Sequence, residues 1–348
     1  DYFARTPSLP FLPPSGDEGR YLALLALARL AGLRALEKIR LLEALDSGID
    51  LARLRLGDLE AILGRSLALG SWEPKALLAV AEGDALLLDR LGAVFVSILD
   101  PGYPPALREI AQAPFGLYLR GQALPTELPS VSIVGTRYPT GAGLEAAMGL
   151  GRDFARLGLA VVSGLARGID AAAHRGALAG GGQTCAVLPC GVDAIYPLGN
   201  AGLAGTILST GGLLVSEYPP GTEIRKSRFP ERNRIISGLS RGLVVVEAPA
   251  DSGALITADF ALDQGRDVFV AASRLGGPRS LGLDRLALEG ARPVAFAQDV
   301  LRDWGIDCPA QDRLQSSPGE GESASWGRSL AAALRAELAQ GVPSQGRW

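Results

Sequence analysis

The residues of this chain that are best suited to binding chemistry gather between Arg225 and Arg241. Six cations surround a single aromatic ring, Phe229, and only one carboxylate, Glu231, lies among them. The cations are Arg225, Lys226, Arg228, Arg232, Arg234 and Arg241. Asn233 lies between Arg232 and Arg234. Guanidinium and ammonium groups meet phosphates while an exposed ring stacks on a base, so the pattern favours a single-stranded nucleic acid as ligand. The alternative is a solvated helix face with a buried phenyl ring.

A second candidate loop follows the apolar run that ends at Val134. Gly135 allows the backbone to approach a ligand, and Arg137 adds a full charge with forked donors. Thr140 is expected to cap a helix that begins near Gly141, and free amides at that helix start would attract an anion. The loop therefore predicts a phosphate site, although a turn glycine beside a solvent-facing arginine has the same sequence.

A third loop, from Ser163 to Asp170, again places glycine at a turn and carries Arg167. His174 is the only histidine, and its spacing from Asp170 is consistent with an acid-base pair. No serine or cysteine is placed beside them as a nucleophile, so we interpret Asp170 as a helix cap and the histidine as structural. Tyr196 and Tyr218, in later loops, are candidates either for base stacking or for a place in the core.

The elements that would position these loops are predicted from Val131 onward, where short apolar runs alternate with helical segments. The runs cover residues 131–134, 159–163, 184–188, 213–216, 242–247, 267–271 and 292–296. Continuous apolar strands alternating with helices are typical of βαβ units covered on both faces. We therefore predict an α/β fold with a Rossmann-like, doubly wound, mostly parallel sheet, in which ligands bind beyond the carboxyl ends of the strands.

The rest of the chain divides by composition. We predict a flexible lead-in over residues 1–18, a small helical domain over 19–92, a connector over 93–130, the Rossmann-like domain over 131–305, and a linker with a short C-terminal helical segment over 306–348. Two helical stretches between Leu27 and Leu45 are parted by Gly32, as in units that touch DNA backbones. Because a second turn glycine is missing, a plain packing module is the simpler interpretation.

Composition excludes several classes of protein. The chain has 348 residues, 47% of them hydrophobic, and a net charge of -3, so it can bury a large core while positive charge acts locally. Arg29 interrupts the apolar run from Tyr21 to Leu33, which predicts neither membrane insertion nor a signal peptide, and we expect a cytoplasmic protein. The cysteines at 185, 190 and 308 have no disulfide or zinc-ligand spacing. No metal site is therefore predicted. No nicotinamide or flavin cofactor is predicted either, because the GAGLEA sequence at 141–146 lies within a helix rather than in a turn and no Asp or Glu ends the second strand.

Four segments together resemble a known family. They read SIVGTRYPTGAG, VVSGLARGIDAAAHRGAL, FPERNRIISGLS and EAPADSGALITADFALDQGRDVF, and they are similar in order and spacing to the bacterial DNA-processing protein A family, also called Smf, over about residues 100–304. The resemblance implies a Rossmann-like domain preceded by a small domain similar to sterile alpha motif modules. It also implies a non-enzymatic protein that binds single-stranded DNA without sequence preference, protects it from nucleases, forms a homodimer and loads the recombinase RecA during natural transformation.

The resemblance also implies roles for individual residues. It assigns a phosphate pocket to Gly135, Arg137 and Lys226, base stacking to Phe229, and an extended positive groove to Arg232 and Arg234. Asn233, Arg167 and Arg225 complete the expected DNA-binding set, and no catalytic residue is expected. The chain departs from the family pattern at residues 271–274, where AASR replaces a proline-glycine pair, and the residues after the linker at 316–323 are too few for a winged helix.

Two further expectations concern self-association and a rival function. The Leu-rich helix from Leu281 to Gly290 is our expected dimer surface, with Leu281, Leu283 and Leu286 as its contacts. The alternative function is a nucleotide phosphoribohydrolase of similar fold, for which Glu247 ends a strand. The loop at 248–254 lacks the PGGxGT pattern of such enzymes, and the next helix offers only Asp259 as a carboxylate in the catalytic position.

Overall fold

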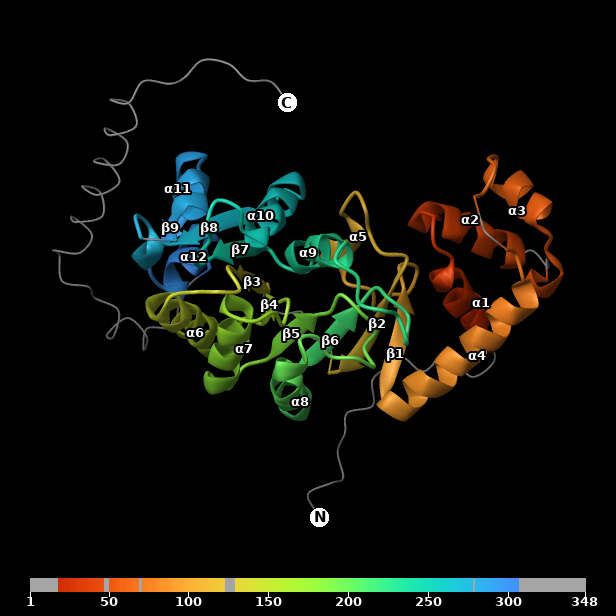
Figure 1. Ribbon diagram of the computed structural model, residues 1–348, viewed down its shortest axis with the longest axis horizontal. Helices are drawn as coiled ribbons and strands as arrows, with labels where there is room; N and C mark the ends of the chain where they lie inside the picture. The colour runs from red at the N-terminus through yellow and green to blue at the C-terminus, as the bar shows by residue number, and fades with distance from the viewer. Residues whose placement is uncertain (1–17, 47–49, 69–70, 123–128, 278, 307–348) are drawn as a thin grey trace, which may run out of the picture.

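The computed structural model describes residues 18–46, 50–68, 71–122, 129–277 and 279–306. Within these ranges a bundle of helices lies at one end of an elongated molecule, and a sheet flanked by helices forms the other end (Figure 1). The predictions for the lead-in and for the C-terminal segment fall on residues outside the described ranges, apart from Glu18 and Ile306.

The N-terminal helices pack through leucines at helical spacing. They are α1 (Glu18–Arg29), α2 (Ala35–Asp46), α3 (Leu56–Leu63) and α4 (Pro74–Leu91), with the short 3-10 turn η1 (Leu51–Arg53) before α3. Leu25, Leu41 and Leu59 are fully buried in this bundle, whose core continues into Phe95 and Tyr118 of the sheet. The small helical domain is therefore present and is packed against the edge of the sheet. No helix in the described residues is long and apolar enough to cross a membrane.

The predicted connector contributes to the sheet, which corrects our interpretation of it. It contains β1 (Ala93–Ser97), the short helix α5 (Pro105–Arg108) and β2 (Gly116–Gly121). Strand β1 pairs antiparallel with β2, and β2 pairs antiparallel with β6 (Leu213–Ser216). The prolines that suggested a connector lie between the two strands, where they shape the turns.

The remaining strands form the predicted parallel sheet. They are β3 (Val131–Val134), β4 (Val161–Ser163), β5 (Thr184–Val187), β7 (Gly242–Val245), β8 (Asp267–Ala271) and β9 (Arg292–Val294). The strand order is β1-β2-β6-β5-β4-β3-β7-β8-β9, and every pair from β6 to β9 is parallel. After β3 the chain builds the sheet outward to β6 and then returns to place β7 beside β3. This reversal of winding direction creates a crevice between β3 and β7, and the Rossmann-like class is confirmed.

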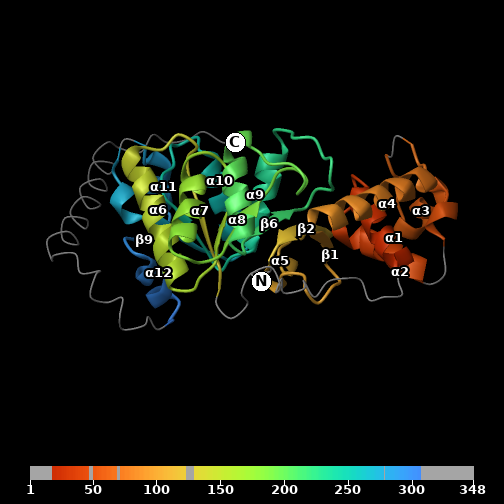
Figure 2. The same ribbon diagram turned by 90° about the horizontal axis from the view of Figure 1, so that it is seen from below.

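Helices cover both faces of the sheet (Figures 1 and 2). One face carries α6 (Gly141–Arg156), α7 (Ile169–Ala179), α8 (Ala201–Ser209) and α12 (Ala297–Asp303), and the other carries α9 (Arg228–Gly238), α10 (Gly253–Asp263) and α11 (Leu281–Leu288). Alternate residues of β7 divide between the two faces: Val244 packs with the α6 and α7 core, whereas Leu243 and Val245 pack with the α9 and α10 core. Two short 3-10 turns lie in loops that follow strands: η2 (Leu198–Asn200) follows β5, and η3 (Ala272–Arg274) follows β8.

Candidate nucleic-acid interface

A cavity of about 660 Å³ opens at the crevice between β3 and β7. Most of its lining comes from the loop after β3, the loop after β7, and the first turns of α9 and α10, with single residues from the loops after β4 and β5 and from the segment before α11. The polar and aromatic residues among its walls are Thr136, Arg137, Tyr138, Asp170, Tyr196, Lys226, Phe229, Arg232, Asn233, Asp251, Ser252, Thr257 and Arg279. This is the position at which an open α/β sheet binds its ligand.

The loop after β3 is fixed by contacts with two neighbouring elements. The Thr136 amide donates to the Glu247 carbonyl at 2.7 Å, and the Thr136 carbonyl accepts from the Ile169 amide at 3.2 Å. A side chain at Gly135 would place its Cβ 2.6 Å from Cγ1 of Ile169, so the loop can lie this close only because that residue is glycine. The candidate phosphate loop is thus held in place before any ligand binds.

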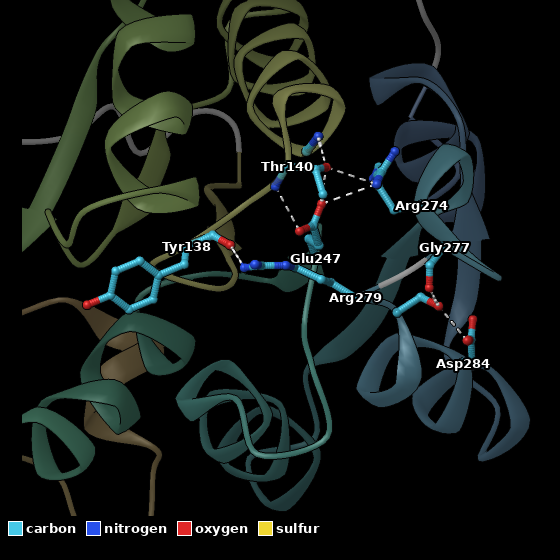
Figure 3. Close-up of polar contacts among 9 residues, drawn as sticks. Tyr138, Thr140, Glu247, Arg274, Gly277, Arg279 and Asp284 are labelled. Atoms are coloured by element: carbon cyan, nitrogen blue, oxygen red, sulfur yellow. Dashed lines mark hydrogen bonds and ion pairs between the residues drawn. The ribbon is translucent and has the colours of Figure 1, made fainter.

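A carboxylate of the protein lies at the start of α6 and takes one of the amides there that the sequence predicted to be free for a ligand. Glu247 is 1% exposed, and its Oε1 accepts from the Thr140 amide at 3.0 Å (Figure 3). Its Oε2 accepts from Thr140 Oγ1 at 2.7 Å and from Arg274 Nη2 at 3.2 Å. The predicted Thr140 cap is confirmed, because Oγ1 also accepts from the Gly143 amide at 3.1 Å. The carboxylate stabilises the helix start, as an incoming phosphate would have done.

These contacts also decide what Glu247 can do. Both carboxylate oxygens accept hydrogen bonds, and the side chain is closed off from solvent by Arg274, which is 12% exposed in its side chain. The departure from the family pattern at residues 271–274 therefore places an arginine over the strand end. A hydrolase would need a carboxylate accessible to its substrate here, and the geometry instead ties Glu247 into the framework of the loop.

Arg137, Lys226 and Phe229, which the family resemblance grouped in one site, line the same cavity. Arg137 is exposed, and its guanidinium carbon lies 4.9 Å from the centroid of the Phe229 ring. Tyr196 meets the same ring edge-on at 5.4 Å between centroids, and Lys226 lies exposed in the turn before α9. The cation holds the phenyl ring in place on the wall of the cavity while keeping its own donors at the surface.

Arg232 lines the cavity from beneath. It is 3% exposed, and its Nη1 donates to the Val187 carbonyl at 2.5 Å. Burial lowers the pKa of Arg232 to about 10, and the nearby charge of Asp170 opposes that shift. A Cβ at Gly164 would lie 2.0 Å from Nη1, so the glycine makes room for the guanidinium. Arg232 is therefore a buried residue at the bottom of the cavity, which corrects the expectation that it extends an exposed positive groove.

Asp170 does not cap α7 as expected, since the helix begins with Ile169 after the positive-φ residue Gly168. Its carboxylate instead accepts from the Gly164 amide at 3.1 Å and the Ala166 amide at 3.4 Å. Burial raises the pKa of Asp170, and the charge of Arg232 opposes the rise. The residue therefore braces the loop after β4.

Three predicted cations do not line the cavity. Arg234 is 9% exposed and lies on the other side of α9, where its Nη2 contacts both oxygens of Glu217 at 2.6 and 2.7 Å. This placement corrects the expectation that Arg234 extends the groove. Arg167 and Arg225 are exposed but lie outside the walls, and Arg225 pairs with Glu223 at 3.2 Å. Asn233 does line the cavity, with its Nδ2 3.4 Å from the Gly253 carbonyl.

Tyr138, Arg279 and the loop before α10 are wall residues that the sequence argument missed. Tyr138 directly follows Arg137, so the loop already selected contained the signal. Arg279 lies more than a hundred residues further along the chain, and its guanidinium donates to the Tyr138 carbonyl (Figure 3). Only the fold brings these two residues together.

His174 is structural, as interpreted from the sequence. It is fully buried, and its Nδ1 lies 2.7 Å from Thr184 Oγ1. The threonine hydroxyl donates its proton to the Val161 carbonyl, so Nδ1 must be the donor in the histidine contact. Burial lowers the pKa of His174 to about 3, with the charges of Arg232 and Arg175 adding to the shift. The imidazole is neutral and does not contact Asp170, which leaves no acid-base pair.

A second cavity, of about 770 Å³, lies between the helical domain and the opposite face of α9. Its buried cations are engaged by the protein: Arg234 pairs with Glu217, and Lys38 Nζ donates to the Ala28 carbonyl at 3.0 Å. Burial lowers the pKa of Lys38 to about 8, opposed by the charge of Glu217. Two exposed cations, Arg34 and Arg108, also line this second cavity. The two exposed aromatic rings of the described residues, Tyr138 and Tyr196, line the first cavity, which is therefore the candidate site. In the described ranges no three His, Cys, Asp or Glu side chains form a group that could hold a metal ion.

The sequence of this chain is similar to those of a known family. A family model described as DNA recombination-mediator protein A matches residues 94–305. DNA processing protein DprA of Streptococcus pneumoniae is 42% identical over 212 residues, which cover 60% of this chain and 73% of that protein. Protein Smf of Synechocystis is 42% identical over 233 residues, which cover 65% of this chain and 58% of that protein. The matched region thus spans less than two thirds of the Synechocystis relative.

Two solved structures are similar to the structure described above. The X-ray structure of DNA processing protein A from Streptococcus pneumoniae superposes with a TM-score of 0.65 at 35% identity, covering 83% of this chain and 99% of that one. A structure of DNA processing protein A from Helicobacter pylori, which addresses the single-stranded DNA binding mode of that protein, gives a TM-score of 0.54 at 29% identity. It covers 60% of this chain and 95% of that one.

Proposed function

This chain belongs to the DNA recombination-mediator protein A family, and we propose that it binds single-stranded DNA in the cavity between β3 and β7. The observation that carries this proposal is the placement of Arg137 and Lys226 around the Phe229 ring at the switch point of the sheet. A sequence-independent ligand requires contacts to phosphates and to the faces of bases, and the cavity offers both. The relative from Helicobacter pylori binds single-stranded DNA, which supports the same ligand here.

Binding is proposed to proceed by capture of an unpaired strand. Arg137 and Lys226 neutralise phosphates and release condensed counterions, while a base stacks against Phe229. The bases of duplex DNA are stacked on one another, so a duplex presents phosphates but no free base face. The site should therefore prefer single strands even though part of its affinity comes from charge alone.

A salt series tests the electrostatic part of this proposal. If each protomer neutralises about three or four phosphates, log affinity plotted against log salt concentration has a slope of roughly -2 to -3 on single strands. Fluorescence anisotropy of a labelled oligothymidylate measures the slope in the intact chain. A slope near zero would contradict phosphate binding by the exposed cations.

We further propose, from the family, that the bound protein protects incoming DNA and loads the recombinase RecA onto it in the cytoplasm during natural transformation. The proposal is supported by the family description as a recombination mediator. The measurement that tests it is the rate of RecA filament formation on single-stranded DNA with and without this chain. An unchanged rate in the presence of bound protein would oppose it. We propose no catalytic activity for the site.

Self-association remains a proposal, and its surface needs revision. Leu283 is 0% exposed and Leu286 is 4% exposed, and both pack in the core beneath α11. They cannot form a contact between protomers without unfolding the helix from the sheet. Leu281 is 71% exposed and Leu288 is 45% exposed, so a homodimer contact on α11 would use the outer side of the helix. Sedimentation velocity of the full chain tests for the dimer.

A further inference from the structure

Exposed aromatic rings are concentrated at the candidate site. Among the described residues only two aromatic side chains are exposed, Tyr138 at 72% and Tyr196 at 40%, and both line the cavity that contains Phe229. The other described phenylalanines, tyrosines and tryptophans are buried or half-buried. A ring left in water is unremarkable singly, but rings gathered at one cavity indicate a surface that is covered when a ligand binds.

Tyr138 is held by its backbone and leaves its ring open. Its amide lies 3.2 Å from Thr136 Oγ1, and its carbonyl accepts from the Arg279 guanidinium. Figure 3 shows the ring pointing away from the cluster formed by Thr140, Glu247 and Arg274. The loop therefore holds the Tyr138 ring at a fixed place. The polar contacts among Thr140, Glu247 and Arg274 do not involve this ring.

Two cations lie close to the backbone of Tyr138. Arg137 precedes Tyr138 in the chain, and Arg279 reaches its carbonyl from the segment before α11. The exposed charged residues that line the cavity are three cations, Arg137, Lys226 and Arg279, and one carboxylate, Asp251. The excess of positive charge extends from Phe229 to the Tyr138 rim, so a phosphate beside Tyr138 would be attracted as well.

We propose that Tyr138 and Arg279 form a second nucleotide subsite, in which a base stacks on the tyrosine ring and an adjacent phosphate pairs with the arginine. The subsite rests on the proposed function and extends it: the strand continues past Phe229 across the loop after β3. A ring and a forked cation together suit any nucleotide, because every base has a stacking face and every nucleotide a phosphate. Full affinity therefore requires an oligonucleotide that reaches both rings.

The test measures the affinity of oligothymidylates of increasing length for the unmodified chain and for variants of Tyr138 and Arg279. We expect Tyr138→Ala to weaken binding of long oligothymidylates about tenfold, close to 1.4 kcal/mol, and to leave the salt slope unchanged. Tyr138→Phe keeps the ring and should bind within about twofold of the unmodified chain. Arg279→Ala should make the salt slope shallower by about 0.7, the value for one phosphate on a single strand.

Controls separate this subsite from the proposed function itself. Leu198 is 80% exposed and does not line the cavity, so Leu198→Ala is the matched loss of an exposed apolar side chain and should bind as the unmodified chain does. If Phe229→Ala weakens binding while Tyr138→Ala does not, the proposed function stands and the second subsite is wrong. If the unmodified chain binds no single-stranded DNA, both proposals fail. Equal losses in Tyr138→Ala and Tyr138→Phe would also overturn stacking on this ring.

Discussion

Arg137→Ala is expected to weaken single-stranded DNA binding by roughly 30- to 150-fold, or about 2–3 kcal/mol. The change removes a charge-assisted contact to phosphate and the cation that holds the Phe229 ring from 4.9 Å away. Because one phosphate contact is lost, the salt slope should become shallower by about 0.7. Anisotropy titrations at several salt concentrations measure both quantities.

The matched control for this loss is Arg156→Ala. Arg156 is also exposed, but it ends α6, whereas the cavity lies at the start of that helix. Both variants lower the net charge by the same amount, so a general charge effect would weaken them equally. Equal affinities for the two variants would remove Arg137 from the phosphate site.

Glu247→Ala is expected to destabilise the fold by about 3–5 kcal/mol. The side chain of Glu247 is 1% exposed and that of Arg274 is 12% exposed, so removing the carboxylate takes the ion-pair partner from a largely buried guanidinium and leaves Nη2 only its contact with Thr140 Oγ1 at 3.0 Å. Thr140 also loses the acceptor of its amide and its hydroxyl. Equilibrium denaturation in urea measures the change in the free energy of unfolding.

The control for this prediction is an ion pair of the same chain that is exposed to solvent. Arg285 and Glu289 pair at 2.7 Å on α11 with side chains 73% and 47% exposed, and Glu289→Ala should cost less than about 0.5 kcal/mol. A Glu247→Ala protein as stable as the unmodified chain would show that the carboxylate is not structural. Release of free base from nucleotides by the unmodified chain, lost in that variant, would then restore the hydrolase alternative.

The parallel sheet could be predicted because its strands are buried on both faces and therefore read as continuous apolar runs. The β1 and β2 strands were missed for a physical reason. Residues 98–115, which include several prolines, separate the two strands, and β6, with which β2 pairs, lies about ninety residues further on. Pairing over that distance leaves no local pattern in the sequence.

The site residues that lie close to strand ends could be predicted from the sequence. Those whose position depends on how a helix packs could not. Gly135, Arg137 and Phe229 follow or border elements whose positions the fold class determines. Arg234 lies five positions after Phe229, about 140° around a helix, so both cannot face one groove. The sequence near α9 does not show which of the two residues faces the cavity, because this is decided by the contact of Arg234 with Glu217.

Glu247 is the clearest case of a long-range determinant. It meets Thr140 across 107 positions of sequence and takes the Thr140 amide at the helix start where a phosphate was expected. A Cβ at Gly143 would lie 2.3 Å from its Oε2, so the glycine in the first turn of α6 accommodates the carboxylate. The same glycine resembled part of a nucleotide-binding fingerprint in the sequence, although its role is to admit a side chain of the protein.

The most direct test of the central claim is the ratio of affinities for single-stranded and duplex DNA of equal length, measured for the unmodified chain and for Phe229→Ala. We predict a preference for single strands of at least about tenfold, and a loss of about 1–3 kcal/mol in single-strand affinity on removal of the ring, with duplex affinity little changed. Thermal unfolding of Phe229→Ala checks that the fold is retained. Equal affinity for both forms, or unchanged single-strand binding by a folded Phe229→Ala protein, would contradict the account.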